Sequence, residues 1–144
     1  MSMKLNFAML LLLAFSSVAA AQSAYTPEKG SPERKAILDA LRLPIERDLK
    51  QKVVFVADNF KVQGNFAFVS GTPRNSSGDD PDYARTKYAD QVDSGAFDNN
   101  FFALLKKTGG KWRVAAYAIG CTDVCYVYWW REHRAPKAIF PYTE

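Results

Sequence analysis

The sequence predicts one α+β domain in which an N-terminal helix packs on four antiparallel strands, with a short helix near the C-terminus. Three observations carry this prediction. An apolar stripe at helical spacing occupies residues 32–50, and four runs with strand-favouring composition follow between residues 53 and 119. Glycine-containing turns join these runs in pairs, which is typical of β-hairpins.

The first 21 residues contain, in order, the three parts of a secretory signal peptide: a basic start, an apolar run and a small-residue end. Lys4 precedes an apolar run from Leu5 to Phe15, and small residues end the segment before Gln22. The apolar run is about half the roughly 20 residues that a membrane-spanning helix needs, so we expect cleavage after Ala21 and no permanent anchor. The mature domain would then be periplasmic or secreted.

The charge of the chain favours solubility. The formal net charge is +4 at pH 7, and the loss of Lys4 with the signal segment lowers it by one. So mild an excess does not indicate nucleic acid, which would be an unusual partner outside the cytoplasm. We expect an envelope or secreted protein as the partner, and a homodimer stays open.

The predicted N-terminal helix has clear start signals. Residues 22–30 are polar and small, and we expect them to form a flexible leader. Ser31 is a suitable N-cap and Pro32 suits the first helical position. An apolar stripe then follows at spacings of one, three and four, formed by Ile37, Leu38, Leu41, Ile45 and Leu49. Pro44 lies inside this stretch, so we expect it to kink or split the helix.

The strands are predicted as two hairpins separated by a long loop. The first pairs residues 53–62 with residues 65–71 across Gly64, and the second pairs 97–107 with 111–119 across Gly109 and Gly110. Residues 72–95 are rich in Pro, Gly, Ser, Asn and Asp, so we expect an exposed loop that buries little.

Beyond Gly120, two interpretations compete for an aromatic stretch. A helix from residue 123 to 134 fits because Asp123 at its start and Arg131 and Arg134 at its end complement a helix dipole. Residues 125–130 are also rich in strand-favouring types. We prefer the helix.

Cys121 and Cys125 are the two cysteines of the chain. Secretion would place them where disulfides persist, so we expect a bridge between them. Two free thiols and an intermolecular bridge stay open as alternatives. The spacing is not the CxxC of thioredoxin-like redox sites, and zinc would need ligands that this chain lacks.

Two segments carry a likeness to known families. Residues 63–69 (QGNFAFV) followed by residues 104–114 (LLKKTGGKWRV) resemble the sheet core of the NTF2-like and cystatin-like superfamilies. The resemblance covers roughly residues 33–120 and implies a long helix in the curve of an antiparallel sheet, within a single domain from residue 31 to 144. It does not imply one function, because those folds include isomerases, hydrolases and binding domains.

The titratable residues form no catalytic or metal-binding pattern. His133 is the only histidine, which excludes sites built from two or more histidines. The loop acids Asp79, Asp80 and Asp82 match no EF-hand spacing, and we interpret them as a solvated turn. Spacing selects no general base from four other acids, Asp58, Asp90, Asp93 and Asp98. We therefore assign no catalytic residue, no metal site and no cofactor.

The stretch Tyr126–Trp130 is the most unusual part of the mature chain. Large aromatics beside arginines suit a surface that binds proteins or glycans, so Tyr128, Trp129, Trp130 and Arg131 are the candidate binding residues, with the 72–95 loop. The competing interpretation is that these rings close the open face of the sheet.

The leading prediction is non-catalytic recognition of a protein or other envelope component. One alternative is an NTF2-like small-molecule enzyme that uses a pocket carboxylate with tyrosines such as Tyr83, Tyr88 or Tyr117. A second alternative is an inhibitor of a peptidase or lysozyme.

Overall fold

The computed structural model describes residues 22–144, and the predicted signal segment lies outside them. The elements are, in order, α1 (Pro32–Leu49), β1 (Val54–Gln63), β2 (Phe66–Arg74), α2 (Ala89–Asp93), β3 (Phe101–Thr108), β4 (Lys111–Ile119), α3 (Trp129–Glu132) and the 3-10 turn η1 (Lys137–Ile139). The four strands form one antiparallel sheet in the order β1-β2-β3-β4. The predicted α+β architecture is confirmed at this level.

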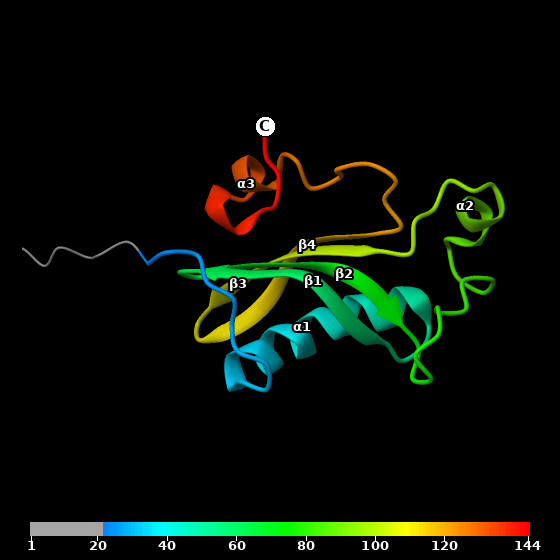
Figure 1. Cartoon of the computed structure of the whole chain (residues 1–144), viewed down its shortest axis with the longest axis horizontal. Helices are drawn as coiled ribbons and strands as arrows, with labels where there is room; N and C mark the ends of the chain where they lie inside the picture. The colour runs from blue at the N-terminus through cyan, green and yellow to red at the C-terminus, as the bar shows by residue number, and fades with distance from the viewer. Residues whose placement is uncertain (1–21) are drawn as a thin grey trace, which may run out of the picture.

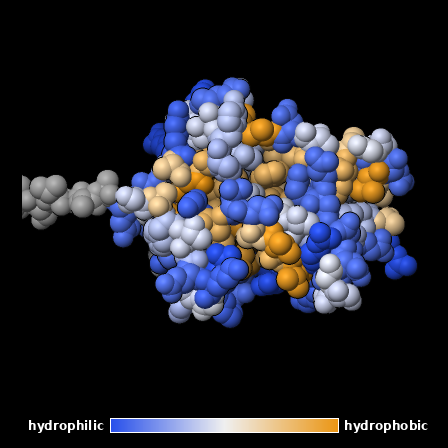
Figure 2. All heavy atoms as spheres, viewed as in Figure 1, coloured by the Kyte–Doolittle hydropathy of each residue, from blue (hydrophilic) through white to orange (hydrophobic). Residues whose placement is uncertain are grey.

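The sheet is covered on both faces. α1 lies across one face, and the C-terminal layer, which we define as residues 121–140, lies across the other (Figure 1). One buried cluster joins the stripe of α1 to the inner side chains of all four strands, and a second joins Phe68 and Leu104 to the C-terminal layer. Figure 2 shows apolar atoms along the middle of the viewed face, between mainly hydrophilic outer layers.

α1 begins as its sequence predicts, and a left-handed residue ends it. The Ser31 side chain accepts a hydrogen bond from the Arg34 backbone N–H at 3.2 Å, which satisfies one of the free donors of the first turn. At the other end, Lys50 adopts a positive φ of 54° and breaks the helical path.

The sequence led us to expect a kink or a split at Pro44. The split is absent, because one helix continues through this residue. The buried stripe extends on both sides of the proline and is formed by Ile37, Leu41, Ile45 and Leu49. Packing of this stripe on the sheet holds the two halves of α1 in line and outweighs the local preference of proline.

Both predicted hairpins are present. Gln63 pairs with Phe66 across the first turn, and Thr108 pairs with Lys111 across Gly109 and Gly110, whose φ angles are 57° and 75°. Positive φ at both turn positions is the geometry that glycine tolerates without strain. The register shifts once in each outer pair, which leaves an extra residue at Asp58 in β1 and at Ala115 in β4.

Residues 22–30, which we expected to form a flexible leader, lie against the sheet in part. The backbone N–H of Tyr25 donates to the Val62 carbonyl at 2.9 Å, and the Val62 N–H donates to the Tyr25 carbonyl at 2.8 Å. Pro27 is buried. The segment thus covers a short part of the outer edge of β1, where a main-chain pair was free to form.

The 72–95 loop buries more than its composition predicted. β2 continues to Arg74, and α2 occupies the end of the segment. Tyr83 and Thr86 are buried, and the Tyr83 ring packs edge-on against Phe97 at a centroid distance of 4.6 Å. The expectation of an exposed loop is therefore wrong at these positions, because aromatic packing holds the loop to the end of the sheet.

The C-terminal helix is shorter than predicted. Helix α3 spans only Trp129–Glu132, and hydrogen-bonded turns replace its expected first part, with the Val127 N–H donating to the Val124 carbonyl. The strand alternative for residues 125–130 is wrong. Cys121 and Cys125 form the predicted disulfide, with Cα atoms 6.3 Å apart. No helix within residues 22–144 is long and apolar enough to cross a bilayer.

A substitution at Gly71 tests whether β1 and β2 need to approach each other closely. A Cβ atom at this position would overlap the Val56 carbonyl oxygen, which is backbone and has little room to move. We expect Gly71→Ala to lower the free energy of unfolding by about 3 kcal/mol in urea titrations. Gly78→Ala is the control, since it meets no atom within 4 Å and carries only the strain of its φ of 88°, about 1 kcal/mol. Equal losses in the two variants would contradict the steric explanation.

Candidate functional site

The predicted aromatic binding residues divide between the core and the surface. Trp129 is only 9% exposed and packs in the second buried cluster with Tyr126 and Phe68. Tyr128 is 45% exposed, and its hydroxyl donates to Glu144 at 3.0 Å. Of the four predicted binding residues, only Trp129 is buried against the sheet, as the competing interpretation expects, whereas Tyr128 and Arg131 are exposed and Trp130 is half-buried.

The exposed remainder of this cluster is basic. The Arg131 guanidinium lies over the Tyr128 ring at 5.4 Å and over the Trp130 ring at 5.3 Å. The Lys137 ammonium lies 3.9 Å from the Trp130 ring centroid. These cations occupy ring faces that a glycan would need for stacking. Tyr128, Trp130 and Arg131 stay predicted contact residues for a protein.

The loop acids are engaged within the loop. Arg74 forms an ion pair with Asp80, which also accepts a hydrogen bond from the Asn99 side chain at 2.9 Å. Asp82 accepts from the Ala84 backbone N–H at 3.0 Å. Within residues 22–144, no three His, Cys, Asp or Glu side chains come together as metal ligands would. These acids therefore organise the turn.

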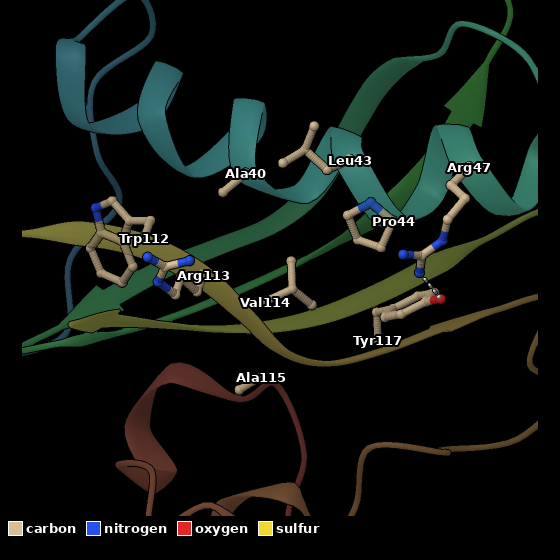
Figure 3. A pocket seen from close by; sticks show the side chains of 9 residues that line it. All are labelled: Ala40, Leu43, Pro44, Arg47, Trp112, Arg113, Val114, Ala115 and Tyr117. Atoms are coloured by element: carbon tan, nitrogen blue, oxygen red, sulfur yellow. Dashed lines mark hydrogen bonds between the residues drawn. The ribbon is translucent and has the colours of Figure 1, made fainter.

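A groove between α1 and β4 is a hollow that the structure adds to the sequence-based candidates. Its volume is about 460 Å³, and Figure 3 shows α1 along one side and β4 along the other. The lining residues are Ala40, Leu43, Pro44, Arg47, Trp112, Arg113, Val114, Ala115 and Tyr117. Six of these nine side chains are aliphatic, proline or tryptophan, so the groove offers apolar surface along its length.

The helix side of the groove carries two features that core packing does not explain. Leu43 is 75% exposed and lies off the buried stripe. Pro44 has no N–H to donate to the Ala40 carbonyl, which a regular helix would satisfy. Both Leu43 and Pro44 line the groove. An exposed apolar side chain is therefore available to a ligand there.

The strand side of the groove is an open sheet edge. β4 is the last strand of the sheet, so one side of it has no neighbouring strand. In a two-residue hairpin the pair beside the turn exchanges hydrogen bonds, and every second residue then directs its main-chain groups outward. By this alternation, the main-chain groups of Trp112 and Val114 face the open edge. Within residues 22–144, no loop or terminal segment forms a main-chain hydrogen bond with either residue.

Two arginines line the groove, and one of them, Arg47, also forms an ion pair with Asp48 at 3.8 Å. Arg47 and Arg113 flank its apolar floor, and none of its nine lining residues is acidic. The Arg47 guanidinium donates to the Tyr117 hydroxyl at 3.4 Å, as Figure 3 shows. A ligand with carboxylate groups would therefore meet complementary charge beside the apolar surface.

Asp48 forms a network of polar contacts beside the groove, one of them with the lining residue Tyr117. Its carboxylate accepts from the Tyr117 hydroxyl at 2.8 Å and from the Tyr88 hydroxyl at 3.4 Å, and it pairs with Lys87 at 2.9 Å. The structure thus joins a carboxylate to two of the three tyrosines named for the enzyme alternative. This acid is not among the four from which a general base was sought in the sequence.

The electrostatics of Asp48 do not suit a general base. Burial tends to raise its pKa, but the hydrogen bonds from Lys87 and Tyr117 and the charges of Lys87 and Arg47 outweigh burial and lower the pKa below its usual value. The side chain of Asp48 is only 10% exposed. A carboxylate held ionised and fully partnered is a weak acceptor for a substrate proton at neutral pH.

The sequence carries two signals for this groove that the predictions did not use. Leu43 lies off the apolar stripe of the helix, and Pro44 follows it directly. The turn at Gly109 and Gly110 fixes which residues of β4 direct main-chain groups away from β3. The sequence does not reveal that β4 is an edge strand or that α1 runs beside it, because both facts depend on tertiary structure.

No family model, no curated protein and no solved structure matches this chain. The geometry of the groove and of the charged surfaces therefore carries the functional proposals.

Substitutions of Trp129 and Tyr128 test whether the first residue belongs to the core and the second to the surface. We expect Trp129→Ala to lower the free energy of unfolding by about 3–5 kcal/mol, because it opens a cavity in the second buried cluster. Tyr128→Ala is the neighbouring control and should cost below about 1 kcal/mol, because the ring is exposed. Denaturant titrations measure both. A Trp129 variant as stable as the Tyr128 variant would show that the core does not need Trp129.

The lowered pKa of Asp48 predicts how the stability of the protein depends on pH. Because its folded-state pKa is lowered, its stabilising contribution is present above the unfolded value of 3.8 and is lost as the pH falls through the folded value. The stability difference between the wild type and Asp48→Asn should be constant near neutrality and shrink below about pH 4. Asp93→Asn is the control, because within residues 22–144 the Asp93 side chain makes no hydrogen bond or ion pair. A difference for Asp48 that grows on acidification would contradict the network.

Proposed function

We propose that the protein is a secreted, non-catalytic module that binds an extended segment of another protein along the open edge of β4. One observation carries the proposal: an unpaired strand edge borders an apolar groove flanked by Arg47 and Arg113. Addition of a strand to a sheet edge is a recurring mode of peptide recognition. Main-chain hydrogen bonds supply affinity in this mode, and side-chain pockets supply specificity.

The groove defines the chemistry of the bound segment. The outward N–H and C=O groups of Trp112 and Val114 would pair with the partner strand. The apolar side chains of the partner strand would contact Leu43 and Pro44. Its acidic side chains would reach Arg47 and Arg113. The extra residue at Ala115 interrupts the register, so the paired stretch is short. We therefore propose an extended segment that carries both apolar and acidic residues.

A second copy of this chain is a poor occupant of the edge. Lys111 and Arg113 alternate along β4 with Trp112 and Val114, and two copies of this edge would bring these cations together. Like charges and bulges are devices by which edge strands avoid pairing with themselves. A homodimer through this edge is therefore disfavoured, and a different, acidic chain is favoured.

Two broader predictions support the same function. A helix across a four-stranded antiparallel meander agrees with the proposed NTF2-like or cystatin-like scaffold, whose members include binding domains. The disulfide agrees with an oxidising compartment, so we propose that the protein acts in the periplasm or outside the cell.

A library of displayed random peptides tests the proposal directly. We expect selected peptides to combine acidic and apolar residues and to bind the wild type. Leu43→Ser with Arg113→Glu should weaken their binding at least about ten-fold, by loss of apolar contact and reversal of charge. In amide NMR spectra of the wild type, the peptides should shift the Trp112 and Val114 signals.

Arg85→Glu is the matched charge-reversal control, because Arg85 is exposed and lies outside the groove. This variant should bind like the wild type. Selected peptides that keep their affinity for the groove variant, or that shift only signals of the C-terminal layer, would overturn the proposal.

A further inference from the structure

Basic residues gather at one end of the sheet. We call this the hairpin end, and it comprises the turns between β1 and β2 and between β3 and β4. Four of the eight residues from 106 to 113 are Lys or Arg, and none is acidic. Lys61, Lys106, Lys111 and Arg113 are exposed. Within residues 22–144, none of them forms an ion pair.

Acidic residues gather at the opposite end. β2 ends at Arg74 and β3 begins at Phe101, so the segment between them lies away from both turns, and Figure 1 shows α2 at that far end. This segment contains two cations, Arg85 and Lys87, against six acids, Asp79, Asp80, Asp82, Asp90, Asp93 and Asp98. The charges are therefore separated along the sheet, which gives the molecule a preferred orientation in an electric field.

The chain enters the domain at the basic end. The Gln22 carbonyl accepts a hydrogen bond from the Gln63 side chain at 2.8 Å, beside the first turn. Only six residues separate Gln22 from the apolar run that ends at Phe15. If this run lies in a membrane during export, the hairpin end is the part of the domain closest to the lipid headgroups.

We propose that the hairpin end docks on an anionic phospholipid surface, with Lys61, Lys106 and Lys111 toward the headgroups and the acidic end away from them. Clusters of Lys and Arg beside a membrane bind anionic lipids by this long-range attraction. Before the expected cleavage after Ala21, the membrane is the anionic surface next to this end, and this favours a lipid surface over a soluble polyanion. The three lysines do not line the α1–β4 groove, and of them only Lys111 lies on β4, beside Trp112 of the open edge.

Vesicle co-sedimentation tests the docking. The full chain is expressed, the mass of the purified form is determined, and binding to phosphatidylglycerol–phosphatidylcholine vesicles is compared with binding to pure phosphatidylcholine. We expect binding only to the anionic vesicles, and its loss as the salt rises from roughly 0.05 to 0.5 M. Lys106→Gln with Lys111→Gln should weaken binding roughly twenty-fold, since each lysine contributes about five-fold.

The control removes the same charge elsewhere. Lys50→Gln with Arg85→Gln changes two exposed cations outside the hairpin end and should bind nearly as well as the wild type. Equal losses in the two double variants would overturn the proposal, because net charge alone would then explain binding. Binding to soluble heparin but not to anionic vesicles would also overturn it.

Discussion

Burial of both faces of one sheet is the constraint on which the rest of the structure depends. Four strands present apolar side chains in two directions, and one helix covers only one of them. The other face holds Phe68 and Leu104, both fully buried, and the chain covers it with its last residues. Packing therefore explains why part of the aromatic stretch is buried.

The same architecture leaves the two sheet edges unequal. Tyr25 bonds to Val62 and protects part of the edge of β1. β4 has no such segment within residues 22–144, and α1 runs beside it to form a groove. The binding surface that we propose thus follows from how a meander sheet ends, with the exposed Leu43 and the arginines giving that edge its selectivity.

The sequence predicted local structure better than it predicted the site. Helix α1 and both hairpins were predictable because their signals, a cap, an apolar period and glycine turns, act over a few residues. The continuity of α1 through Pro44 was not, since packing against the sheet decides it. The burial of Tyr83 in the loop and of Trp129 in the core depends on partners far along the chain, such as Phe97 and Phe68. The groove escaped prediction for the same reason.

The order of the strands also has a consequence for folding. Within each hairpin the strands pair across a short turn and close at low entropic cost, whereas β2 and β3 meet across residues 75–100. The residues that cover the second face of the sheet follow all four strands in the sequence. Phe68 and Leu104 therefore stay open to water until these residues are synthesised and folded, and in that interval the nascent chain is exposed to aggregation.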